Sequence, residues 1–273
     1  MVEVLVYFFV PALVGVLIGI ASGLLGIGGG TVMVPIFRLA FGMSATMSTA
    51  TSLFAIIPTS ISGAISHVKG KTCIPALGIA AGLGGACMSP IGVWLAQLSP
   101  DWLVMLAAAL IIGYSAINMV KKAFKVPRAG QPAEGADAAA PTADDSSLSR
   151  KQLLQGAAIG LVAGLASGYV GVGGGFIMVP LMLSIIGIPM RKASGTSLIA
   201  VMILAIPGVI EQGIIGNINY LAGIAIVIGT IPGAVIGARL VTKVPERTLR
   251  LLFGCFLIVA AVMLVLNEVG IFG

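Results

Sequence analysis

Charged residues are scarce in this sequence. Only 9% of its 273 residues are Asp, Glu, Lys or Arg, and a single residue is His, whereas about a quarter of the residues are charged in an ordinary soluble domain. Hydrophobic residues make up 58% of the chain, and several apolar runs reach the roughly 20 residues that a helix needs to cross a bilayer. The composition therefore excludes a soluble globular domain and predicts an all-α polytopic membrane protein.

Sequence patterns for metals, nucleotides and nucleic acids are also missing. The three cysteines stand apart in apolar sequence, without a CxxC or His-rich spacing, so we expect no metal site and no cofactor. No GxxxxGK[ST] pattern of an ATP-driven motor occurs. The net charge of +6 is not arranged as a basic face interleaved with aromatic residues. The expected partners are a small anionic substrate, for which the reasons follow below, and the lipid bilayer; nucleic acid is not expected, and the oligomeric state stays open.

Glycine, in contrast, is abundant and its placement repeats. The stretch 22–35 recurs as 167–180, with nine of fourteen positions identical at a constant offset of 145 residues. The same offset aligns Thr51-Ser52-Leu53 with Thr196-Ser197-Leu198. Isolated glycine or alanine matches could arise by chance, but these longer matches in one register indicate an internal duplication.

The duplication divides the chain into a first transmembrane repeat (1–120), a linker (121–151) and a second transmembrane repeat (152–273). The linker is basic at both ends and rich in Ala, Pro, Gly and Asp between them, a composition typical of a flexible segment. After the N-terminal segment, which ends near residue 25, we expect apolar segments at 31–46, 47–66, 73–97, 101–120, 152–172, 175–189, 193–214, 219–240 and 246–267.

Basic residues predict the orientation of these segments. Lys and Arg flank the linker, which is therefore expected to be cytoplasmic. The basic loop at Lys69 and Lys71 corresponds to uncharged 214–216, whereas basic Arg191-Lys192 corresponds to uncharged Thr46-Met47. Equivalent loops then face opposite sides, so the two repeats are predicted to be inverted. Arg38 does not fit this scheme, and the pattern leaves open whether each half has five segments or three plus a re-entrant hairpin.

Three adjacent glycines in each repeat interrupt apolar sequence, although each glycine disfavours helix by about 1 kcal/mol relative to alanine. A broken helix exposes backbone N–H groups and carries a partial positive charge at its new N-terminus. Two such breaks could face one anion near the middle of the membrane. The alternative is close helix packing, which explains Gly15, Gly19, Gly160 and Gly164 better than it explains adjacent glycines. The candidate anion-binding residues are Gly28, Gly29, Gly30, Gly173, Gly174 and Gly175.

Hydroxyl groups near the breaks are further candidates, because they can donate to an anion without the cost of a buried cation. They belong to Ser22, Thr51, Ser52, Ser167, Thr196 and Ser197. The alternative is that these hydroxyls bond to the carbonyls of their own helices. His67 and Glu211 lie late in apolar segments and are candidates for proton coupling, unless they merely lie at the membrane interface.

The two Gly-x-Gly-Gly-Gly stretches, each ending in Met-Val-Pro and followed by Thr-Ser-Leu, resemble the sulfite exporter TauE/SafE family of membrane permeases. The resemblance covers nearly the whole chain apart from the linker. It implies transport of a sulfur-containing anion, such as sulfite or an organosulfonate, across a bacterial or archaeal cytoplasmic membrane. Neither the exact substrate nor the direction of transport follows from it.

These observations together predict a secondary transporter with its site at the two glycine-broken helices. An anion channel is the alternative within transport. A membrane-embedded enzyme would need a cluster of catalytic polar groups, which one His and one nearby acidic residue do not supply. We therefore expect no enzymatic activity.

Overall fold

The computed structural model describes residues 2–124 and 149–268, with side chains described for 11–124 and 149–266. These residues form helices and contain no strand. The elements are α1 (Val2–Leu25), α2 (Gly30–Phe41), α3 (Ala45–Lys69), α4 (Pro75–Leu98), α5 (Asp101–Phe124), α6 (Arg150–Val170), α7 (Gly175–Leu181), the π-helix η1 (Met182–Ile186), α8 (Met190–Ile215), α9 (Tyr220–Leu240) and α10 (Glu246–Glu268).

Seven of the described helices are long and apolar enough to cross a membrane, namely α3, α4, α5, α6, α8, α9 and α10. The prediction of an all-helical, multi-pass membrane protein is confirmed. The second segment of each half is too short to cross. Helix α2 has 12 residues, which extend about 18 Å against a hydrocarbon core of about 30 Å. In the second half, α7 and η1 occupy the equivalent place.

The ends of the predicted linker belong to helices. Helix α5 continues to Phe124, and α6 begins at Arg150 with Ser149 as its N-cap. Residues 125–148, which form the rest of the predicted linker, lie outside the described residues.

The two halves of the chain are interlocked. Helix α1 packs along α9 and α6 packs along α4, while α5 packs against α10 and α3 against α8. At the offset of 145 residues, α6 is the counterpart of α1 and α9 is the counterpart of α4. The first helix of each half therefore packs mainly against a helix of the other half.

Small residues allow these two helix pairs to approach closely. A Cβ atom at Gly15 or Gly19 would lie 2.4 Å from a backbone oxygen of α9. A Cβ atom at Gly160 or Gly164 would lie 1.9 or 2.1 Å from a backbone oxygen of α4. The predicted packing role of these four glycines is confirmed, as is usual for small residues between membrane helices.

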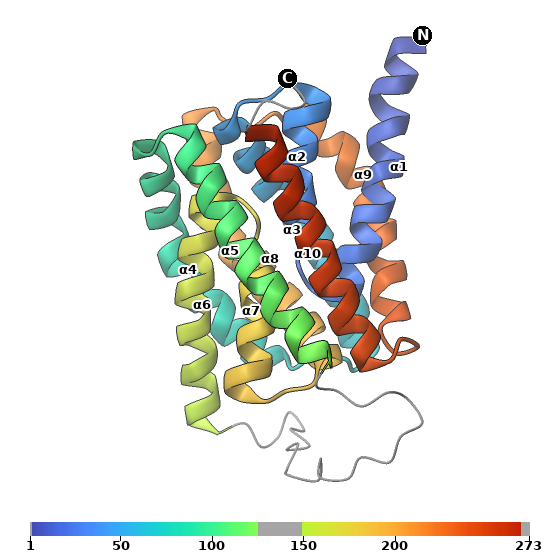
Figure 1. Cartoon of the computed structure of the whole chain (residues 1–273), viewed down its shortest axis with the longest axis vertical. Helices are drawn as coiled ribbons and strands as arrows, with labels where there is room; N and C mark the ends of the chain where they lie inside the picture. Colours follow the sequence, from blue (N-terminus) through green and yellow to red (C-terminus); the bar gives the residue numbers. More distant parts are fainter. Residues whose placement is uncertain (1, 125–148, 269–273) are drawn as a thin grey trace.

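Helices α1 and α6, which are equivalent at the offset of 145 residues, run in opposite directions through the bundle (Figure 1). Helix α1 starts at the upper end, whereas α6 starts at the lower end, where the linker joins it. The loops that follow α3, η1 and α9 also lie at this lower end, which we call the linker end. The basic residues of these loops and their flanks thus share one end, whereas α2, which carries Arg38, ends at the opposite one.

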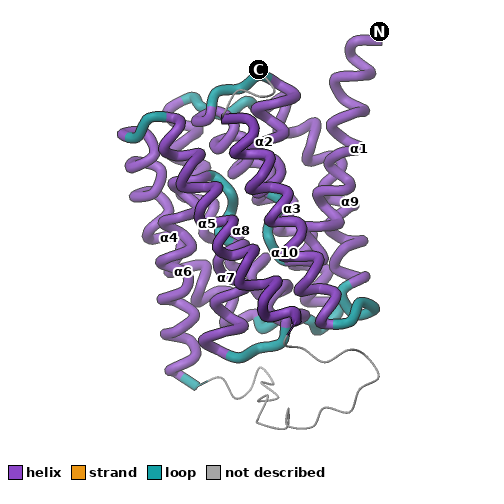
Figure 2. Tube along the Cα trace, viewed as in Figure 1, coloured by secondary structure: helices purple, strands orange, loops and turns teal. Residues whose placement is uncertain are grey.

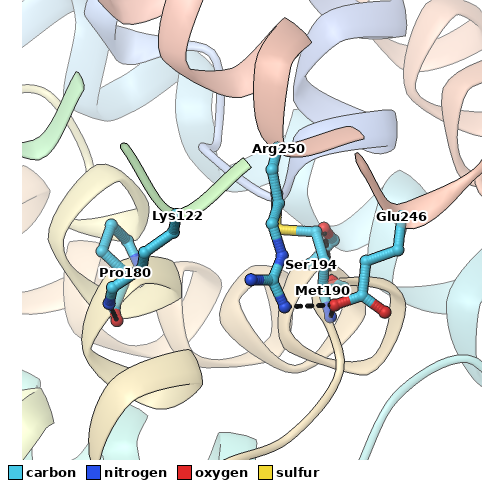
Figure 3. Close-up of polar contacts among 6 residues, drawn as sticks. All are labelled: Lys122, Pro180, Met190, Ser194, Glu246 and Arg250. Carbon is cyan, nitrogen blue, oxygen red and sulfur yellow. Dashed lines mark hydrogen bonds and ion pairs between the residues drawn. The ribbon is translucent and has the colours of Figure 1, made fainter. Parts of the chain in front are cut away.

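An acidic residue in the last helix of each half holds the central helix of that half. Asp101 accepts a hydrogen bond from the amide of Ala45 at the start of α3 (3.3 Å), and Glu246 accepts one from the amide of Met190 at the start of α8 (3.4 Å). Glu246 is also paired with Arg250 (Figure 3). A carboxylate is favourable at a helix N-terminus, so these equivalent contacts fix where α3 and α8 begin.

Candidate functional site

The two glycine stretches meet inside the bundle. Figure 2 shows the loops after α1 and α6 among the helices and not at either end of them. A Cβ atom at Gly30 would lie 2.6 Å from the carbonyl oxygen of Val172, and one at Gly175 would lie 2.4 Å from the carbonyl oxygen of Gly26. Each stretch thus contacts the backbone of the other. We call residues 26–30 and 171–175 together the glycine crossing.

Glycine is required at the crossing for two reasons. Gly28, Gly29, Gly173 and Gly174 have φ angles of +74°, +86°, +85° and +69°, in the left-handed region that side chains disfavour. Gly30 and Gly175 instead begin α2 and α7 and lie against the opposite stretch. The predicted helix breaks are present in both halves, and close packing, the alternative explanation, also accounts for two of the six glycines.

Several amides of the first stretch are open. The amide nitrogens of Gly28, Gly29 and Gly30 donate no hydrogen bond within the described part of the chain. In the second stretch, the amide of Gly175 donates to the carbonyl of Gly173 at 2.8 Å. The amides of Gly173 and Gly174 donate to no described residue either, so the first stretch has one more free glycine donor than the second, beside the positive end of α2.

Helices α3 and α8 flank the crossing with equivalent apolar side chains. A Cβ atom at Gly28 would lie 3.0 Å from Val201 and 3.3 Å from Ile56. At Gly173 the same two side chains are again the nearest neighbours, with Ile56 at 2.8 Å and Val201 at 3.5 Å. Ser60 lies one helical turn beyond Ile56, with its Oγ 3.5 Å from the Cβ position of Gly28.

Buried hydroxyls without a partner gather on the elements around the crossing. Ser22, Ser52, Ser60 and Ser167 are fully buried, and none of their Oγ atoms has a hydrogen-bond partner in the described residues. A buried hydroxyl without a partner is costly and uncommon. Three of these serines are among the residues predicted to bind the anion. Ser60 was missed, although its position two turns after Ser52 places both on one face of α3.

The two predicted threonines are already engaged. The Oγ1 of Thr51 accepts a hydrogen bond from the amide of Asn219 (3.0 Å), and the Oγ1 of Thr196 accepts one from the amide of Ile74 (2.9 Å). Asn219 and Ile74 are equivalent residues that precede α9 and α4. Both threonines thus tie a central helix to the beginning of a helix of the other half.

The serines that follow these threonines differ. Ser197 donates to the carbonyl of Gly26 at 2.7 Å, and its Oγ also lies 2.8 Å from the carbonyl oxygen of Ser194. Its equivalent, Ser52, has no partner. Ser197 therefore holds the first glycine stretch in place, while the hydroxyl of Ser52 remains available.

His67 is fully buried and bonded at both ring nitrogens. Its Nε2 lies 2.7 Å from the carbonyl oxygen of Gly23 and its Nδ1 lies 2.7 Å from the Oγ1 of Thr72. The equivalent Gln212 accepts a hydrogen bond from Asn217 at 2.8 Å. His67 comes eleven residues after Ile56, about 16 Å along α3, and it secures the last turn of α1, three residues before the crossing begins at Gly26.

Glu211, in contrast, lies away from the crossing. It follows Val201 by ten residues, about 15 Å along α8. The side chain is partly buried, and its Oε2 has no partner in the described residues. Since α3 and α8 run in opposite directions (Figure 1), the two predicted proton-coupling residues lie toward opposite ends of the bundle.

Comparisons with known proteins identify a family and several relatives. Residues 11–264 match the family model "Sulfite exporter TauE/SafE". The chain is 27% identical to "Probable membrane transporter protein YunE" of Bacillus subtilis, over 97% of this chain and 99% of that protein. It is 29% identical to a "Probable membrane transporter protein" of Haemophilus influenzae, over 93% of this chain and 97% of that protein.

An archaeal relative matches a shorter region. The chain is 34% identical to "Probable membrane transporter protein MJ0441" of Methanocaldococcus jannaschii, over 38% of this chain and 41% of that protein. No solved structure gives a significant match.

Proposed function

Because the chain belongs to the sulfite exporter TauE/SafE family of membrane transporters, we propose that it is a secondary transporter for a small sulfur-containing anion such as sulfite or an organosulfonate. The substrate site is the glycine crossing. Two inverted repeats supply equivalent elements to this site, and transport proceeds by movement of helices around it.

The unpartnered hydroxyls of Ser52 and Ser60 carry this proposal. They lie on the face of α3 that borders the crossing, and both are fully buried. An anion with three oxygen atoms can accept hydrogen bonds from the hydroxyl of Ser60, whose Oγ lies 3.5 Å from the Cβ position of Gly28, and from the open amides of Gly28–Gly30. Ser52 lies about 12 Å earlier along α3, so its hydroxyl would bond to the anion at a neighbouring position on the transport path. The N-terminus of α2 adds a partial positive charge at the same place. Bound substrate would satisfy donors that otherwise have no partner.

The remaining predicted site residues divide by their contacts. Ser22 and Ser167 stay candidates for binding the anion, because their hydroxyls have no partner. Thr196 and Ser197 act in our proposal by holding the helices and the first glycine stretch, since their hydroxyls already donate to backbone carbonyls. Thr51 ties α3 to the start of α9 by accepting a bond from Asn219.

The proposed orientation places the linker end in the cytoplasm. The loops after α3, η1 and α9 lie at that end (Figure 1), and Lys or Arg residues flank each of them. Such an excess of basic residues is typical of cytoplasmic loops. The protein would then be a multi-pass protein of the cytoplasmic membrane, with 125–148 on the cytoplasmic side.

The test is uptake of sulfite into liposomes that contain the purified protein. We expect saturable uptake and, in the double variant Ser52→Ala/Ser60→Ala, at least about a tenfold loss. The melting temperature should not fall, because removal of a buried hydroxyl that has no partner is nearly neutral or stabilising. The matched control is Ser89→Ala, which removes another buried, unpartnered hydroxyl from α4. It should leave uptake unchanged.

Other outcomes separate the alternatives. Unchanged uptake in the double variant would exclude the site, and uptake that never saturates would favour a channel. Turnover of a substrate in detergent would indicate an enzyme. Uptake that increases with an imposed pH gradient, and loses that response in His67→Gln or Glu211→Gln, would assign proton coupling to the substituted residue.

A further inference from the structure

A cavity of about 580 Å³ opens between α3 and α9. The last residue of α3, Lys69, and the last turn of α9, which contains Arg239, contribute to its wall. Ser66 and Thr242 add hydroxyl groups. Since the loops after both helices lie at the linker end (Figure 1), the cavity lies at that end as well.

The two cations of this cavity are not neutralised. The side chains of Lys69 and Arg239 form no hydrogen bond or ion pair with any described residue, and no acidic residue lines the cavity. Cations are favourable in the last turn of any helix, so their presence alone would not indicate a ligand. What requires an explanation is that Lys69 and Arg239, on two different helices, line the same cavity.

The rim of the cavity is apolar and exposed. Ile65 lines the cavity and exposes 50% of its surface, and Ile61 and Ile231, one helical turn before the lining residues Ile65 and Val235, expose 41% and 40%. In a chain that spans a membrane, such side chains face the hydrocarbon. The cavity thus joins a cationic, hydroxyl-lined pocket to a surface that suits acyl chains, which is the arrangement of headgroup sites between membrane helices.

The equivalent place in the other half does not have this chemistry. At the offset of 145 residues, Lys69 corresponds to Ile214 and Arg239 corresponds to Trp94. Ser66 corresponds to Glu211. The cationic pocket is therefore not a by-product of the duplicated scaffold. It is a feature of the linker end alone.

We propose that this cavity binds the headgroup of an anionic phospholipid. The phosphate lies between Lys69 and Arg239, because a guanidinium and an ammonium both donate to phosphate oxygens. Ser66, whose hydroxyl has no partner in the described residues, can donate to the same group. The acyl chains lie along the isoleucines of the rim, which a soluble phosphate would not use.

The experiment measures binding of phosphatidylglycerol to the full-length protein in detergent, by native mass spectrometry and by the shift of the melting temperature. Wild-type protein should bind phosphatidylglycerol in preference to phosphatidylcholine. The double variant Lys69→Gln/Arg239→Gln should bind it roughly tenfold to thirtyfold more weakly, since each basic residue near an anionic lipid contributes a several-fold factor. The matched control is Lys151→Gln/Lys243→Gln, which removes the same charge from exposed residues outside the cavity.

Each other outcome contradicts the proposal. An equal loss in the control variant would show diffuse attraction of anionic lipid to the linker end. Inorganic phosphate that raises the melting temperature as much as phosphatidylglycerol would indicate a site for a free anion. Unchanged lipid binding in Lys69→Gln/Arg239→Gln would exclude the cavity. Both residues are exposed, so this variant should fold. Neither readout depends on transport, so a failure here would leave the proposed function untouched.

Discussion

The two halves of the chain make the same contact with equivalent threonines, but the serines that follow these threonines differ between the halves. Thr51 and Thr196 each accept a hydrogen bond from the residue that precedes a helix of the other half. Ser197 holds the carbonyl of Gly26, whereas Ser52 holds nothing in the described structure. Contacts that both halves share explain the fold, and positions that differ indicate where the two halves have separate tasks.

Other differences point the same way. Ser60, whose hydroxyl has no partner, corresponds to Ala205 in the second half. The open amides differ at one position, because the amide of Gly175 donates to the carbonyl of Gly173, whereas that of its equivalent, Gly30, donates to no described residue. Near the crossing, serine hydroxyls without a partner are therefore more numerous in the first half, where they belong to Ser22, Ser52 and Ser60, than in the second, where Ser167 has one.

The largest effect should come from separating the two glycine stretches. Gly175→Ala would place a Cβ atom 2.4 Å from the carbonyl oxygen of Gly26, which the backbone can relieve only by moving the stretches apart. We expect loss of sulfite uptake per folded protein and a lower yield. The control Gly113→Ala has open space around its Cβ position and should retain uptake. Normal uptake in Gly175→Ala would show that contact between the stretches is dispensable.

A smaller effect is expected from substitution of Ser52 and Ser197, which should differ in how much they lower the melting temperature. Ser197→Ala leaves the carbonyl of Gly26 without its hydrogen bond, at a cost of about 1–3 kcal/mol. Ser52→Ala removes a hydroxyl that has no partner and should not lower the melting temperature. Thermal unfolding in detergent tests both variants. Equal melting temperatures would remove the difference between the halves on which the site assignment depends.

The smallest effect is expected from substitution of Thr51 and Thr196, which should lower the melting temperature by similar amounts. Thr51→Val and Thr196→Val each remove one hydrogen bond to a backbone amide, at a net cost of about 1 kcal/mol. Thr196→Val also removes the bond that its hydroxyl donates to the carbonyl of Lys192 in the same helix, a kind of bond that adds little to stability. Their melting temperatures should fall by similar amounts, with sulfite uptake per folded protein close to wild type. A specific loss of uptake in either variant would return that threonine to the substrate site.

Much of the fold could be predicted because its causes are local. The segment expected at 73–97 is observed as Pro75–Leu98, and the one expected at 219–240 as Tyr220–Leu240, since apolar length and turn residues set such limits. The pairing of α1 with α9 could not be predicted. Gly15 and Gly19 indicate that another backbone approaches closely, but they do not identify which one.

The sequence could predict the region of the candidate site but not the contacts of its individual side chains. The repeated glycines locate the crossing, but sequence cannot distinguish a hydroxyl that is already bonded, as in Thr51, from one that is not, as in Ser52. That distinction depends on where Asn219 lies, and Asn219 is 168 residues away along the chain. The cavity at Lys69 and Arg239 was missed for the same reason, because its two cations come from different halves.

The interlocked pairs of helices also constrain how the protein is made. The glycine face of α1 packs against α9, which follows it by about 200 residues, or roughly 10–40 s at the usual rates of translation. Until α9 has been inserted, the first helix has no partner for that face. Assembly must therefore wait for the last third of the chain, and a ribosome that stops before α9 would release helices that are inserted but unable to complete their packing.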